Sequence, residues 1–193
     1  MPYNATVVES ADLGLTAWSL DPATCIVSAG LATTVQYLAA VYYKFDPATA
    51  SLPSRVLVPN GVAGTSTILQ AALINMDQVG QNAPGTVLAT SPATGTAAGA
   101  GLNSLPLTYA ATAPAQLPQG RYWIGLMNTT GTTTTFLASS NPGAGNLGVN
   151  MGADAAHTRF GIAATTGAFG ASIVVASIVN TVGAGLCLCA ALA

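Results

Sequence analysis

The sequence predicts an all-β protein: an antiparallel β-sandwich of the jelly-roll kind, with an extended N-terminal arm. Short runs of aromatic and β-branched residues recur along the chain, and clusters of Gly, Pro and Asn separate them. No stretch shows the 3.6-residue periodicity of a clear amphipathic helix. We therefore expect residues 1–33 to form the arm and residues 34–193 to form one sandwich domain.

The strongest predicted strand is residues 121–127, Arg-Tyr-Trp-Ile-Gly-Leu-Met. Residues 117–120 precede it and favour a turn, because proline presets φ at the second turn position and glycine suits the fourth. Alternation places Tyr122, Ile124 and Leu126 on one face, and Trp123, Gly125 and Met127 on the other. Both faces are apolar. The strand should therefore be covered on both sides, either as the central strand of a sandwich or at a subunit contact.

The remaining strands are expected at residues 35–45, 55–59, 68–76, 86–90, 105–109, 134–139, 172–179 and 186–191. Residues 68–76 and 86–90 should form a hairpin. Residues 134–139 should be the hairpin partner of the central strand, and a turn should join the last two strands. The small-residue segments 91–101 and 141–150 are predicted surface loops.

Charge is scarce in this chain. The sequence is 51% hydrophobic and 5% charged, with a net charge of −2 and four Lys and Arg residues. A surface that binds nucleic-acid phosphates is therefore not expected, nor is a basic helix that lies on a membrane. Residues 169–193 carry no charge, but Asn180-Thr181 and the glycines that follow favour two strands over a membrane span. We expect much of the exterior to be buried in a homo-oligomer, with a trimer favoured.

The sequence predicts neither an enzyme nor a metal or cofactor site. His157 is the only histidine, Asp154 lies three residues earlier, and no Gly-x-Ser-x-Gly motif is present. Two alternatives remain open for the cysteines. Cys25 pairs with Cys187 or Cys189, or all three are buried thiols in a protein made in a reducing cytoplasm.

A few residues are predicted to serve structure and assembly rather than chemistry. Trp18 should anchor in a core or on a neighbour. Arg121 and Arg159 should clamp an acid or a set of carbonyls, within the subunit or between subunits, unless they lie in solvent at strand ends. The full set of predicted structural and assembly residues is Trp18, Asp21, Pro22, Gly120, Arg121, Tyr122, Trp123, Arg159 and Phe160.

Four pieces of the chain carry a family resemblance. They are residues 14–22 (Gly-Leu-Thr-Ala-Trp-Ser-Leu-Asp-Pro), the hairpin from residues 70–73 to 86–90, residues 117–126, and Arg159-Phe160-Gly161. In these pieces the chain resembles the small jelly-roll virion proteins of tailed bacteriophages, of the head decoration, head fibre or minor tail type. The resemblance covers residues 14–161 and leaves out the Cys187-Leu188-Cys189 tail.

The resemblance implies a non-enzymatic virion protein that is assembled in the cytoplasm of the host bacterium. The expected role is a capsid decoration (cement) protein on the outer surface of the particle. Its partners would be other copies of itself and the major capsid protein or another virion protein, with the N-terminal arm docking on the neighbour. The alternative is a tail-associated module that binds a receptor or glycan through the loops at 91–101 and 141–150. These loops contain no aromatic or charged residue, which favours the structural role.

Overall fold

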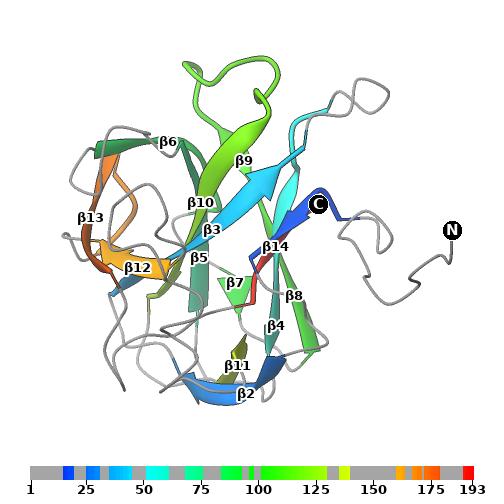
Figure 1. Ribbon diagram of the computed structural model, residues 1–193, viewed down its shortest axis with the longest axis vertical. Coiled ribbons are helices and arrows are strands. Elements are labelled where there is room, and N and C mark those ends of the chain that lie inside the picture. The colour runs from blue at the N-terminus through cyan, green and yellow to red at the C-terminus, as the bar shows by residue number, and fades with distance from the viewer. Residues whose placement is uncertain are drawn as a thin grey trace, which may run out of the picture.

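The computed structural model describes residues 15–19, 25–30, 35–44, 51–60, 68–75, 84–92, 96–97, 101–129, 135–139, 160–163, 167–170, 172–178 and 189–193. The regular elements in these ranges are all strands, and all of their pairings are antiparallel. Two sheets pack as a sandwich (Figure 1). The predicted all-β antiparallel sandwich is confirmed. Within the same ranges, no helix is long and apolar enough to cross a membrane.

The first sheet has six strands. In spatial order they are β1 (Ala17–Trp18), β14 (Ala191–Leu192), β4 (Arg55–Asn60), β11 (Thr135–Ser139) and β2 (Cys25–Gly30), with β8 (Gly101–Pro106) also paired to β4. The second sheet has eight strands. They are β7 (Thr96–Ala97), β5 (Ile68–Asn75), β10 (Gly120–Asn128), β3 (Gln36–Tyr43), β12 (Phe160–Ala163), β13 (Ser172–Ile178), β6 (Pro84–Thr90) and β9 (Thr108–Tyr109).

The second sheet closes on itself, because β6 pairs with β5 as well as with β13. The pairings run from β5 through β10, β3, β12, β13 and β6 back to β5. All six strands contribute to one buried cluster, which we call the ring core. Its members are Leu38, Ala40, Ala72, Ile74, Val87, Trp123, Ala163 and Ile173, with Phe169 packed against them. The chain therefore has a closed ring of strands beside an open sheet, rather than two open sheets (Figure 1).

A second buried cluster lies between the two sheets, and we call it the inter-sheet core. Its largest fully buried members are Leu69, Leu73, Leu105, Leu117, Ile124, Leu126 and Leu192. Strands β3, β5, β6 and β10 contribute to both cores, so they form a wall that the cores share. Burying a side chain of this size stabilises the fold by about 1.5–3 kcal/mol. Side chains buried in either core therefore stabilise the shared wall.

The shared wall explains why the segment at residues 121–127 is apolar on both faces. Strand β10 pairs with β3 on one edge and with β5 on the other. Tyr122, Ile124 and Leu126 lie in the inter-sheet core, while Trp123 lies in the ring core. The prediction of a central strand with two covered faces is confirmed. Both faces are covered by this chain itself.

One predicted pairing is wrong. β11 is not the hairpin partner of β10, because β3 and β5 occupy both edges of β10 and β11 pairs with β4 and β2 in the other sheet. The turn predicted to join the last two strands lies within residues 179–188, outside the described residues. β13 belongs to the ring, while β14 pairs with β1 and β4. Proximity in sequence favours hairpins, but burial of both faces decided these partners.

The hairpin predicted from residues 68–76 and 86–90 is confirmed, since β5 pairs with β6. The segment predicted as the loop 91–101 includes β7, which pairs with Ile68 and Leu69 of β5. β1 and β2 lie within residues 1–33, and they pair with β14 and β11 respectively. The predicted loop at 141–150 lies outside the described residues.

Candidate functional site

A surface hollow of about 240 Å³ lies beside the first residues of β10. It is lined by Asn75, Leu88, Pro114, Pro118, Gln119, Gly120, Arg121 and Tyr122. These residues come from the end of β5, the middle of β6, the connection between β9 and β10, and β10 itself. Asn75 of β5 lies opposite Tyr122 at this place, and β10 begins two residues before Tyr122, at Gly120.

The connection at residues 110–119 forms one side of the hollow and is held at three points. The amide of Ala113 donates to the carbonyl of Ala110 at 2.9 Å, which closes a turn. The side chain of Leu117 is 1% exposed and anchors the connection in the inter-sheet core. The hydroxyl of Tyr122 donates to the carbonyl of Pro118 at 2.7 Å. The part of the connection that contains Pro118 is therefore fixed to the inter-sheet core.

Two buried tyrosines, Tyr43 and Tyr122, and the partly buried Tyr109 support this end of the sandwich. The rings of Tyr43 and Tyr122 meet edge to face, with centroids 6.1 Å apart and planes at 88°. The hydroxyl of Tyr109 donates to the carbonyl of Pro53 at 2.8 Å. Burial, with a smaller contribution from neighbouring tyrosines, raises the pKa of Tyr109 and of Tyr122 above the usual value. Both phenols are therefore neutral hydrogen-bond donors at neutral pH.

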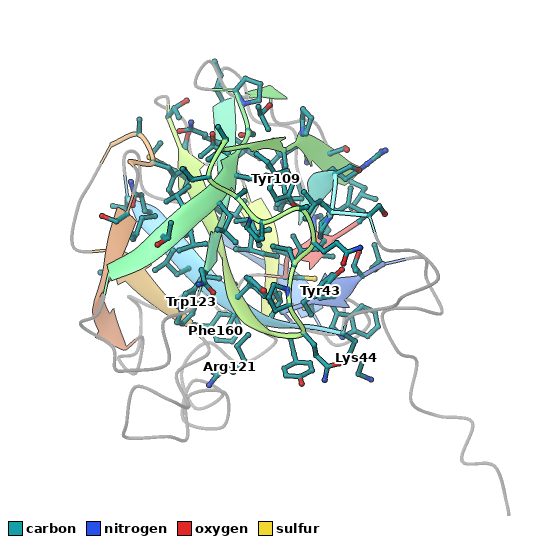
Figure 2. All side chains as sticks on the ribbon, turned by 90° about the horizontal axis from the view of Figure 1, so that it is seen from above. Tyr43, Lys44, Tyr109, Arg121, Trp123 and Phe160 are labelled. Atoms are coloured by element: carbon teal, nitrogen blue, oxygen red, sulfur yellow. The ribbon has the colours of Figure 1, made fainter. Side chains whose placement is uncertain are left out.

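The opposite face of the β3–β10 pair points outward at this end of the molecule. Tyr42 is 51% exposed and lies in register with Arg121. The side-chain amide of Gln119 donates to the Tyr42 hydroxyl at 2.9 Å, which fixes the ring. Lys44 follows β3 and is exposed. Figure 2 shows Arg121 and Lys44 at the edge of the molecule, while Tyr43 and Trp123 lie closer to its centre. We call Tyr42, Lys44, Gln119 and Arg121 the outer face.

Three of the predicted structural and assembly residues meet at the hollow. Gly120, half-buried Arg121 and buried Tyr122 all line it. Trp123, the next residue, points into the ring core instead.

The other predicted residues lie elsewhere. Phe160 is 0% exposed and pairs with Ala39 of β3, so it is a buried residue of β12. Trp18 is half-buried in β1, where it pairs with Ala191. Asp21, Pro22 and Arg159 lie outside the described residues.

Sequence reasoning missed the polar residues that complete the hollow and the outer face: Tyr42, Asn75 and Gln119. One signal was available for Tyr42. In the run Tyr42-Tyr43, strand alternation places the two rings on opposite faces of the strand. Asn75 and Gln119 carry no such signal, because their place in the site depends on which strands flank β10.

The described residues supply hydrogen-bonding and packing groups at this site. The lining residues include Asn75, Gln119 and Arg121, which are polar, and Pro114, Pro118 and Leu88, which are apolar. No group of three or more His, Cys, Asp or Glu that could hold a metal ion occurs in the described part of the chain. Cys25 and Cys189 are not joined in a disulfide. His157 and Cys187 lie outside the described ranges.

Neither a protein-family model, nor a curated protein, nor a solved structure matches this chain.

Proposed function

We propose that this protein is a non-enzymatic structural protein of a virus particle, a decoration protein on the outer surface of a tailed phage capsid. In this role each subunit adds contact area across its neighbours, and many weak contacts act together. The expected partners are further copies of the chain and the major capsid protein. The shortage of basic residues suits an outer position better than one that faces packaged DNA.

The observation that carries this proposal is the exposed, uncharged segment from Gly101 to Gly120. It includes β8, β9 and the connection to β10, most of its positions are exposed, and none of its twenty residues is charged. Leu102 is 65% exposed within it. A soluble protein surface normally carries about 25–35% charged residues. A neutral surface of this length suits burial against a neighbouring subunit, because it has no charge to desolvate.

Genetic deletion with electron microscopy tests the virion location. Antibodies against the protein should label the heads of purified particles of the phage that encodes it. Particles from a phage with the gene deleted should lose the label and rupture at a lower temperature, because the cementing contacts are missing. Labelling at the tail tip alone would favour the second candidate below. Particles without any copy of the protein would overturn the proposal.

The docking role of the N-terminal arm needs a deletion that spares the sheet. Removing residues 1–22 would remove β1, which pairs with β14. Removing residues 1–14 leaves every described strand in place. Loss of particle binding by the shorter deletion, with an unchanged melting temperature, is the result expected if the arm docks. Unchanged occupancy would show that docking uses another surface.

Light scattering after size exclusion tests self-association. We expect a closed oligomer, with a trimer favoured, over a wide range of concentration. The double substitution Leu102→Lys and Ala111→Lys should weaken it, because it places charges in the neutral segment. A monomer at every concentration would contradict self-association. It would not contradict docking on the capsid, which the electron microscopy tests.

The second candidate is a tail-associated module that binds a receptor or glycan. The outer face favours it, because a half-exposed tyrosine held by an amide is a preformed stacking surface. This surface differs from the loops that the sequence suggested for such a role. A screen of the purified protein against immobilised bacterial glycans tests this candidate, and specific, saturable binding would promote it.

A further inference from the structure

We propose that strand β8 pairs with β8 of a second copy of this chain, so that one antiparallel sheet runs through both copies. The two-fold axis would pass through Asn103. The inference rests on the self-association expected under the proposed function, and it names the strand that carries it. It does not depend on a virion location.

The hydrogen bonds around β4 show the direction of its backbone groups. The amide and the carbonyl of Arg55 both bond to Ala193, at 3.1 Å each, so they point away from Pro106, the residue opposite in β8. One residue earlier the direction is reversed, and the carbonyl of Ser54 accepts from the amide of Leu107 at 2.8 Å. The two strands therefore follow the regular alternation of an antiparallel pair.

This alternation fixes which groups of β8 point away from the sheet. Asn103 and Leu105 turn their N–H and C=O groups to β4, since they lie at odd positions, like Leu107. Leu102 and Ser104 turn theirs to the opposite side. We call the N–H and C=O groups of Leu102 and Ser104 the β8 edge.

The β8 edge is open to another strand. β8 lies at the margin of the first sheet (Figure 1), and β4 is its partner among the strands that the structure describes. Leu102 and Ser104 are both exposed. Edge strands usually carry a charge, a proline within the strand or a bulge that prevents pairing with another chain. β8 has no charge, its proline is its last residue, and its register with β4 is unbroken.

The β8 edge is complementary to itself. With the axis at Asn103, Leu102 of each copy lies opposite Ser104 of the other, and the two residues exchange N–H···O=C bonds in both directions. Pro106 has no N–H group, but it lies outside this block, so no bond is lost. An identical strand thus satisfies every group of the edge. Two-fold contacts of this kind are the commonest in homo-oligomers.

The side chains beside the edge also favour an identical partner. β8 turns Leu105 into the inter-sheet core and Leu102 to the other side of the sheet, where Leu102 is 65% exposed. In the paired copies the two Leu102 side chains are diagonal neighbours and can reach each other. Pairing would therefore remove apolar surface from water without desolvating a charge.

The arginine nearest the edge does not oppose this pairing. Arg55 is exposed and lies opposite Pro106, at one end of β8. Its counterpart in the second copy lies at the other end of the paired strands. Strand rise puts the two positions roughly 20 Å apart, so the like charges do not meet.

Sedimentation velocity of the full chain, over a wide range of concentration, tests the pairing. We expect a dimer or an even multiple of it, in place of the trimer favoured above. Ser104→Pro removes an N–H of the β8 edge and no bond to β4, and it should raise the Kd of the dimer at least tenfold. Ser104→Ala is the matched control, because it keeps both backbone groups. Equal dimer affinity of the two variants would overturn the proposal.

A charge at the axis is the second test, and it replaces Ser104→Pro if that variant fails to fold. Leu102→Lys brings two like charges together and should raise the Kd at least tenfold. Ala111→Lys adds the same charge at an exposed position outside β8 and should leave the Kd unchanged. Equal weakening by both would place the contact elsewhere in the neutral segment, which overturns the edge pairing and leaves self-association standing.

Cysteine cross-linking tests the register. Leu102 of one copy and Ser104 of the other would have Cα atoms about 5.5 Å apart, within the range that a disulfide spans. An oxidised mixture of Leu102→Cys and Ser104→Cys should therefore give a linked dimer of the two variants. The parent, with its three native cysteines, is the control and should not be linked. Linkage of Ser104→Cys with itself to the same extent would overturn the axis at Asn103.

The outcomes separate this inference from the proposed function. A trimer would keep self-association and overturn the edge pairing, because a two-fold contact builds even-numbered assemblies. A monomer at every concentration would overturn both. Virus particles that lack the protein would overturn the virion role, while a dimer that is sensitive to Ser104→Pro would leave this inference standing.

Discussion

The ring of Phe169 lies directly against the α-carbon of Gly125. A Cβ atom at residue 125 would lie 2.8 Å from Cε1 and 3.0 Å from Cζ of Phe169, and 3.1 Å from Cδ1 of Ile74. Glycine in the middle of a strand normally weakens it, and here it leaves space for an aromatic ring to pack on the ring core. The contact joins the centre of β10 to the segment that precedes β13.

Gly125→Ala should therefore destabilise the protein by about 1–3 kcal/mol, which is the usual cost of overpacking a core. Chemical denaturation measures the change. The matched control is Gly120→Ala in the same strand, where a Cβ would meet nothing within 4 Å. The control should stay within about 0.5 kcal/mol of the parent. Phe169→Leu in the Gly125→Ala background should restore part of the loss, and strictly additive effects would show that the two positions do not clash.

The two buried glutamines beside Met127 should respond differently to substitution by leucine. The side-chain amide of Gln36 donates to the carbonyl of Gly167 at 2.6 Å, whereas that of Gln70 reaches the carbonyl of Ser91 only at 3.5 Å. The Oε1 atoms of both are buried, and neither has a hydrogen-bond partner among the described residues. Gln36→Leu should cost about 1–3 kcal/mol, because it leaves a carbonyl without its donor.

Gln70→Leu should be nearly neutral or stabilising, because it removes an unpaired acceptor at the expense of one long contact. Melting temperatures of the two variants under identical conditions check this order. A larger loss for Gln70→Leu than for Gln36→Leu would contradict it.

Leu192 should be a key residue of the first sheet. It is 0% exposed, and its strand β14 joins β1 to β4. Leu192→Ala should cost about 2–5 kcal/mol, from lost burial and the cavity left behind. Leu102→Ala is the control with the same chemistry, because that side chain is 65% exposed and should change stability by less than about 0.5 kcal/mol. Equal losses at the two positions would refute the described place of β14.

Stability should fall at alkaline pH because of the buried tyrosines. Burial raises the pKa of Tyr109 and Tyr122 in the folded state, so the folded protein holds these protons more tightly than the unfolded chain does. Their contribution is fully present below the unfolded pKa of about 10. It is lost as the pH rises above that value toward the raised folded pKa.

Tyr109→Phe tests this linkage. The variant should lose about 0.5–1.5 kcal/mol at pH values well below 10, because the bond to Pro53 is gone. It should then lose less further stability than the parent as the pH rises above 10. Denaturant unfolding at a series of pH values gives both curves. Parallel curves would show that Tyr109 does not contribute to the alkaline loss.

Local patterns predicted most of the strands, because a strand that buries one or both faces carries its pattern in its own residues. The clearest case is residues 121–127, where alternation predicted two covered faces, in a central strand or at a subunit contact, and the structure shows the central strand. The pairing of strands did not follow from their order in the sequence. β11 is close to β10 in sequence, yet β3 and β5 flank β10, since partners are selected by contacts between distant residues.

The sequence by itself determined the all-β class, the central strand and the scarcity of charge, because these are properties of composition and of a period of two. Only the tertiary structure decided that β6 also pairs with β13 and so closes the ring, and that Phe169 packs on Gly125. It also decided that Gln119 connects the hollow with Tyr42. Each of these relations joins residues that are far apart in the chain. The register of the strands places them together, and no local pattern encodes that register.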